Sequence, residues 1–274
     1  MAGLVLVISL LLLYAPVVTK LVSDWWADPD YSHAFLVAPL AAVLVWQRRT
    51  ELIRAERSGS PIGLAVACGA LLLLIAGTLG AELFLTRISL LGFLAGSIVF
   101  LFGWRHLRML AFPLALVLLT IPIPSIVISR LTLSLQLVAS NIAEATLNAL
   151  RIPVLREGNV LSLPNATLQV AEACSGIRSL TALITLALVV ARFSDSRWLP
   201  RTLIIVSAIP IAVLVNGLRV AAAAVGAYLY GTAAVEGFVH ELLGWVMFLV
   251  AFALMAGCAR AVRGRRPRAR LAVP

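Results

Sequence analysis

Long apolar runs alternate with short polar segments along the chain, and most runs approach the roughly 20 residues that a membrane-spanning helix needs. Eight runs have this character: Gly3–Val18, His33–Trp46, Ile62–Gly80, Ile88–Trp104, Met109–Ile123, Ile177–Ala191, Thr202–Leu218 and Phe238–Cys258. The pattern predicts an all-α polytopic membrane protein with about eight transmembrane helices. We expect residues 1–262 to form a single integral membrane domain.

Two further stretches are apolar enough to compete as spans. In Ser125–Leu150, polar residues recur every four positions, at Gln136, Ser140, Glu144 and Asn148. Such a stripe is typical of an interfacial or groove-lining helix, so this helix is expected on the outer surface. For Asn216–Gly231 we expect the outer end of the seventh helix followed by an interfacial or re-entrant turn.

The segment after the striped helix reads "IPVLREGNVLSLPNATLQV", in which Gly, Asn and Pro separate short apolar stretches. This punctuation predicts a small β-hairpin or an extended segment. Together with the striped helix it forms an extracytoplasmic insertion over residues 122–173.

The amino-acid composition indicates that lipid surrounds much of the chain, and it argues against nucleic acid as a partner. Of the 274 residues, 62% are hydrophobic and 12% are charged, so lipid must solvate much of the apolar surface. The net charge of +10 comes mainly from arginines that cluster between apolar runs, which favours membrane topology over nucleic-acid binding. The three cysteines and three histidines show no metal-binding spacing, so no metal and no cofactor is predicted.

The arginine clusters predict the orientation of the spans, because positive charge accumulates on the cytoplasmic side. Clusters follow the second, fourth, sixth and eighth runs: Arg48, Arg49, Arg54 and Arg57; Arg105 and Arg108; Arg192, Arg197 and Arg201; and Arg260 to Arg270. These connections and both termini should therefore be cytoplasmic, with residues 263–274 as a basic tail. Counting Ser125–Leu150 as a span would place the Arg192–Arg201 loop outside.

This topology brings three chemically useful side chains to the same outer interface. Cys174 precedes the sixth helix, Arg219 lies at the outer end of the seventh, and His240 begins the eighth. A helix N-terminus and a nearby cation lower the pKa of a thiol and activate it. His240 would serve as base and then acid, and Arg219 would stabilise an oxyanion or bind a carboxylate. Singly, each residue also has an ordinary role, as a packing thiol, an interfacial imidazole or a snorkelling cation.

Several neighbours are candidates for supporting roles. Arg178 lies four residues after Cys174, and it either supports the site or binds backbone carbonyls. Ser175 is either a helix N-cap or a rival nucleophile. Asn216 shares a helix face with Arg219. Gly244, four residues after His240, would let another backbone approach the histidine.

Three motifs in order, "ACSGIRS", "NGLRV" and "GFVHELLG", resemble those of the exosortase/archaeosortase family of polytopic membrane transpeptidases. The early "DPDYSHAFLVAPL" and the later "PIP" are also similar, so the resemblance runs from about Trp25 to Phe248. It implies that Cys174, Arg219 and His240 form the catalytic set. The family commonly has Ser-His-Gly where this chain has Ser-His-Ala, which leaves His33 as either a supporting group or an interfacial histidine.

The resemblance also implies a substrate class. Family substrates are exported proteins whose C-terminal tail carries a short motif such as Pro-Glu-Pro, a transmembrane helix and a basic cluster. The enzyme would cut this tail at the outer face of the cytoplasmic membrane, form a thioester on Cys174, and transfer the protein to an envelope acceptor, in a context of biofilm polysaccharide or envelope anchoring.

Other classes remain open from the residues alone. A small transporter would show inverted repeats and ionisable groups at the membrane midplane, and a non-enzymatic envelope or exopolysaccharide assembly factor would need no nucleophile. A rhomboid-like serine protease would carry its serine in a Gly-x-Ser-Gly setting, whereas Cys174 here precedes Ser-Gly.

Overall fold

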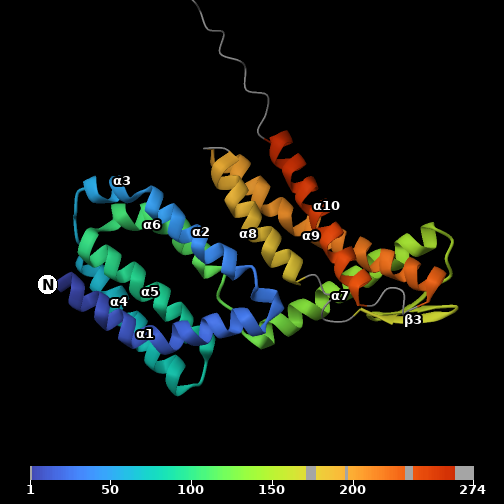
Figure 1. Cartoon of the computed structure of the whole chain (residues 1–274), viewed down its shortest axis with the longest axis horizontal. Coiled ribbons are helices and arrows are strands. Elements are labelled where there is room, and N and C mark those ends of the chain that lie inside the picture. Colours follow the sequence, from blue (N-terminus) through green and yellow to red (C-terminus); the bar gives the residue numbers. More distant parts are fainter. Residues whose placement is uncertain (1, 171–176, 195–196, 232–236, 263–274) are drawn as a thin grey trace, which may run out of the picture. The chain divides into compact units, whose positions relative to one another are not determined.

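The computed structural model describes residues 2–170, 177–194, 197–231 and 237–262. The chain divides into two compact units, Met1–Ser125 and Ile126–Pro274, and each is described by itself (Figure 1). The first contains α1 (Ala2–Ala27), the 3-10 turn η1 (Pro29–Tyr31), α2 (Ala34–Gln47), α3 (Arg49–Arg54), α4 (Pro61–Leu79), α5 (Leu83–Phe102) and α6 (Trp104–Leu118). The second contains α7 (Ser125–Ala149), three strands, α8 (Ile177–Ser194), α9 (Trp198–Tyr230) and α10 (Phe238–Val262).

Helices α4 and α5 of the first unit pack closely because glycines face each other. A Cβ atom at Gly63 would lie 2.2 Å from the Phe100 backbone nitrogen, and one at Gly96 would lie 2.6 Å from the Ala67 nitrogen. Backbone atoms cannot yield at such distances, so any side chain at either position would separate the helices. Small residues at an interface are the usual means of helix association in lipid.

Polar side chains connect the end of α1 and the loop after it to the rest of the first unit. The Trp25 indole Nε1 donates to the Thr120 carbonyl at 2.8 Å, and the Tyr31 hydroxyl accepts from the Ile123 amide at 3.0 Å. Burial raises the pKa of the Tyr31 phenol, so the hydroxyl stays neutral. Arg87, with 3% of its side chain exposed, forms an ion pair with Asp24, as a buried charge requires.

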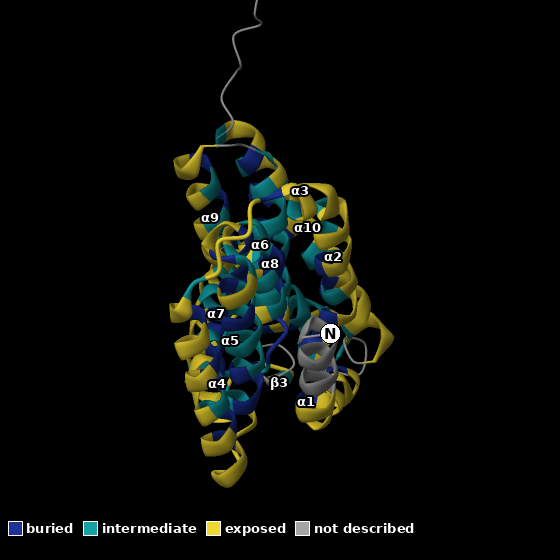
Figure 2. Ribbon diagram, turned by 90° about the vertical axis from the view of Figure 1, so that its left-hand side faces the viewer, coloured by how far each residue is buried: buried dark blue, intermediate teal, exposed yellow. Residues whose placement is uncertain are grey.

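Among the residues that the structure describes, six helices are long and apolar enough to cross a membrane: α4, α5, α7, α8, α9 and α10. Five of them coincide with predicted spans. The count of eight is not confirmed, since α2 and α6 have only 14 and 15 residues. Large apolar side chains such as Leu79 and Trp245 are exposed, and exposed surface runs along the helices (Figure 2). The polytopic all-α membrane architecture is confirmed.

The predicted hairpin is a three-stranded antiparallel sheet in the order β1 (Leu155–Glu157), β2 (Val160–Leu163) and β3 (Ala166–Gln169). Both connections contain two residues. The first carries Gly158 at φ +64°, a backbone conformation that glycine adopts without strain. Leu161, Leu163 and Val170 point into a core that they share with α7 and α9.

The polar stripe of α7 binds the sheet. Gln136 accepts a hydrogen bond from Asn159 Nδ2 at 3.1 Å, and Ser140 donates to the Gly158 carbonyl at 3.0 Å. Glu144 accepts from Arg156 Nε at 2.5 Å. Three of the four stripe residues therefore hold the sheet in place, so the stripe does not require a headgroup interface. Since α7 is also long and apolar enough to span, its placement on the outer surface stays a prediction.

The re-entrant turn expected within Asn216–Gly231 is wrong, because α9 continues as one helix through Tyr230. At 1.5 Å per residue its 33 residues extend about 50 Å, beyond a hydrocarbon core of about 30 Å. Its second half buries Val220, Ala221 and Ala224 against α7 and the sheet. This packing, with the high helix propensity of alanine, keeps the extension helical.

Candidate functional site

The core of the second unit is formed by α8, α9 and α10. Leu183 and Ala187 of α8 pack with Ala212 of α9 and with Ala251 and Met255 of α10. At the opposite end of these helices, Ala191, Ile204 and Ala259 form a separate buried cluster. Helix α9 therefore runs antiparallel to its two neighbours, and the beginnings of α8 and α10 lie beside the middle of α9.

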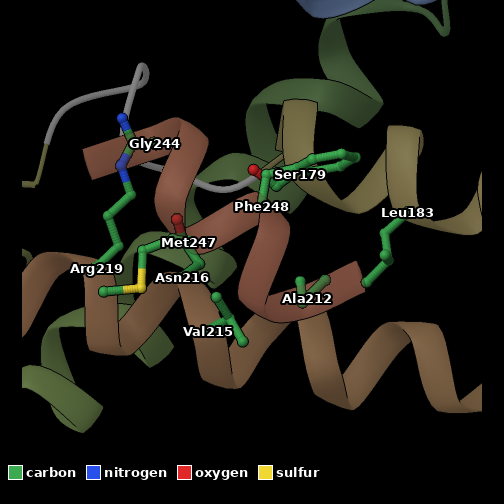
Figure 3. A pocket seen from close by; sticks show the side chains of 10 residues that line it. Ser179, Leu183, Ala212, Val215, Asn216, Arg219, Gly244, Met247 and Phe248 are labelled. Carbon is green, nitrogen blue, oxygen red and sulfur yellow. The ribbon is translucent and has the colours of Figure 1, made fainter. Parts of the chain in front are cut away.

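A small cavity opens between these three helices (Figure 3). Its polar lining comes from Ser179 of α8, Asn216 and Arg219 of α9, and the backbone at Gly244 of α10; apolar side chains such as Leu183, Met247 and Phe248 complete it. The predicted shared face of Asn216 and Arg219 is thus confirmed. Asn216 is 6% exposed, so a buried amide lies one turn from the guanidinium.

The guanidinium of Arg219 contacts the ring of His240, at 2.9 Å between Nη2 and Nε2. An arginine can only donate, so the histidine Nε2 accepts. The neutral imidazole then carries its proton on Nδ1. Both side chains are half-buried, and 21 positions of sequence separate them. The structure therefore brings together two of the three residues that the motifs singled out.

Gly244 creates the space in which this guanidinium lies. A Cβ atom at position 244 would be 3.1 Å from Arg219 Nη2 and 3.4 Å from Cζ. The sequence predicted that another backbone would approach here, and that prediction is wrong. The group against Gly244 is the Arg219 side chain, which extends from α9 to α10 (Figure 3). Arg219 Nε is buried and has no hydrogen-bond partner among the described residues.

Four further residues were predicted for the site. Arg178 is exposed in the first turn of α8. Cys174 and Ser175 lie outside the described residues. His33 precedes α2 in the first unit, where its Nδ1 is 3.1 Å from the Asp30 carbonyl and its ring is 6.4 Å from that of Tyr31. Those contacts belong to the loop after α1, and a supporting role for His33 in the site stays a prediction.

Sequence reasoning did not single out Ser179 or Phe248, which also line the cavity. A serine in a first helical turn and a phenylalanine in a span are both common, so neither residue type gave a signal. Helical spacing would have found Phe248, because it lies four residues after Gly244 and eight after His240, on the same face of α10.

The fold and this site define a polytopic helical membrane protein in which a guanidinium–imidazole pair lies at one end of a three-helix core. The family model of the transmembrane exosortases matches residues 25–257, and the chain belongs to this family. The match covers all three sequence motifs and confirms the resemblance. No curated protein and no solved structure matches the chain.

Proposed function

We propose that this exosortase is a membrane-embedded cysteine transpeptidase. It cleaves the C-terminal sorting tail of exported proteins at the outer face of the cytoplasmic membrane, through a thioester on Cys174, and passes the protein to an envelope acceptor. The observation that carries the proposal is the 2.9 Å contact between Arg219 and His240 beside the beginning of α8. Membership of the exosortase family supports the same reaction class.

Chain connectivity supports Cys174 as the third member of the set. Cys174 precedes Ile177, the first residue of α8, by three positions. Three residues of chain span at most about 11 Å. Ser179, two residues into the helix from Ile177, lines the same cavity as Arg219. The thiol is thus tethered to the helix whose first turns line this cavity, which supports Cys174 as the nucleophile.

The proposed reaction assigns each proton to a named group. His240 takes the thiol proton, and the thiolate of Cys174 attacks the carbonyl carbon of the scissile peptide bond. When the tetrahedral intermediate collapses, the C–N bond breaks and His240 returns the proton to the leaving amine. The acyl group remains as a thioester on Cys174. The acceptor nucleophile attacks it while His240 takes the acceptor's proton, and when the C–S bond breaks that proton returns to the thiolate of Cys174.

The Arg219–His240 contact gives the guanidinium two successive roles. While His240 is neutral, its Nε2 accepts from Arg219, which fixes the ring tautomer. The Cys174 thiol must displace Arg219 from Nε2, which carries the only free lone pair of the neutral ring, before it can give up its proton there. Once His240 is protonated, Nε2 is a donor and repels the guanidinium. The released N–H groups of Arg219 then turn to the oxyanion that forms in the same step. Proton transfer and oxyanion stabilisation are thereby coupled.

Tail removal tests the proposal as a whole. We expect membranes that contain this chain to shorten a co-expressed tail-bearing protein, measured as a mass decrease at the tail. The same substrate with its export signal disabled should stay intact, because the arginine pattern assigns the site to the outer face. A full-length exported substrate alongside abundant enzyme would contradict the proposal.

Gly244→Ala should reduce tail removal about tenfold, because the new methyl group would lie only 3.1 Å from Nη2 and would push the guanidinium out of its place beside His240. The measurement is kcat/KM for a tail peptide in detergent. Gly257→Ala is the matched control, since it lies in the same helix and a Cβ atom there meets nothing within 4 Å. Equal activity of the two variants would show that Gly244 does not position Arg219.

A further inference from the structure

The free edge of the small sheet leads toward the guanidinium–imidazole pair. Asn165, at the beginning of β3, donates to the Tyr228 carbonyl near the end of α9, at 2.7 Å. Val170, directly after β3, is buried in the same cluster as Val220, the neighbour of Arg219. Strand β3 therefore packs against the α9 extension, with its beginning near Tyr228 and its end in the buried cluster that includes Val220 and Ala224. It ends five residues before Cys174.

The register identifies which backbone groups of β3 face outward. Val170 N–H donates to the Asn159 carbonyl, so hydrogen-bonded pairs alternate from there and include Leu168 with Leu161 and Ala166 with Leu163. The N–H and C=O groups of Thr167 and Gln169 consequently point away from β2. Because β3 is the last strand in the sheet order β1-β2-β3, these N–H and C=O groups lie on an outer edge of the sheet. They have no hydrogen-bond partner among the described residues.

These outward groups have the spacing of one extended backbone. Two donors and two acceptors repeat at every second residue, and an added strand matches that pattern over its whole length. The side chains of Thr167 and Gln169 are exposed, while Leu168 between them faces the core. The strand is thus fixed on its inner face by α7 and α9 and is rigid enough to serve as a template.

We propose that the segment of the substrate protein adjoining the scissile bond binds as an added strand on the Thr167–Gln169 edge of β3. This inference rests on the proposed function and names how the same site holds its substrate. The added strand is directed along β3 to the buried cluster that includes Val220, the neighbour of Arg219, so backbone pairing brings the peptide bond toward the reacting groups. Pairing through the backbone binds substrates of different sequence at these positions.

The sharpest test leaves the enzyme unchanged. Synthetic tail peptides are N-methylated at one residue at a time along the segments on both sides of the scissile bond, and kcat/KM is measured with the full-length wild-type chain in detergent. We expect a loss with a period of two on one side of the bond, about three- to tenfold at each sensitive position, because every second N–H faces β3. A profile without this period would overturn the proposal.

The matching change in the enzyme is Thr167→Pro, which removes an outward N–H that β2 does not use. We expect KM for the tail peptide to rise about three- to tenfold. Thr167→Val keeps the N–H and should retain the wild-type KM. An unchanged KM in Thr167→Pro would overturn strand addition. If the variant instead lost dimers while KM stayed unchanged, the edge would pair two copies of the chain, and the proposal would also be overturned. If the wild-type chain removes no tail at all, the proposed function itself fails.

Discussion

Cys174→Ala should abolish tail removal, with a loss of at least about a thousandfold, because neither of the other two cysteines lines the cavity at which the thioester would form. The measurement is the fraction of a tagged, tail-bearing protein that is shortened in membranes with matched amounts of enzyme. Cys174→Ser should also be inactive, since a hydroxyl is a far weaker nucleophile than a thiolate. Wild-type shortening by Cys174→Ala would contradict the enzyme proposal.

The chain supplies matched controls for this experiment. Its other cysteines are Cys68, exposed on α4, and Cys258, half-buried on α10. Neither lines the cavity that contains Arg219. Alanine at either position should leave tail removal within about twofold of wild type. Ser175→Ala tests the serine as the rival nucleophile. This variant should retain activity, and a complete loss of activity would identify Ser175 as the nucleophile.

Arg219→Ala and His240→Ala should each lower kcat/KM by about a hundred- to ten-thousandfold, the range expected for an oxyanion donor or a general base. The double variant should be no worse than the poorer single one. The two side chains are in direct contact at 2.9 Å and act on the same step, so their effects do not add.

Arg178→Ala is the comparison for this pair. The side chain is exposed in the first turn of α8 and is not among the residues that line the cavity with Arg219, so we expect a loss below about tenfold. A loss equal to that of Arg219→Ala would make Arg178 the oxyanion donor. Fully additive losses at Arg219 and His240 would show that the two groups act independently and that their contact has no catalytic purpose.

Arginine positions far from the site proved as informative as the site residues. They predicted that Arg219 and His240 lie at the same level of the helices, and the 2.9 Å contact between them agrees with this, although Arg219 lies in the middle of α9 and not at its end. That inference needed no contact information, since alternating spans and one-sided charge already restrict the topology. Helical spacing placed Asn216 beside Arg219 for an equally local reason.

Two features of the fold depended on contacts distant in sequence. A polar stripe is compatible with headgroups, a groove or a sheet, and only the folded chain shows that Gln136, Ser140 and Glu144 bind the hairpin. The sequence of the alanine-rich segment Asn216–Gly231 is compatible with a turn after the span and also with a continuation of the same helix. Its burial against α7 and the sheet decided for extension.

The sequence by itself determined five of the spanning helices, the place of the small sheet, the membrane class and the family, because apolar runs, turn residues and motifs are local properties of the chain. The tertiary structure alone decided what each polar group touches. The contact of Arg219 with His240 depends on helix packing that places the guanidinium against Gly244, which has no side chain. The position of β3 depends on its packing against the α9 extension. Such contacts join residues that no local pattern relates, so they appear only when the chain is packed.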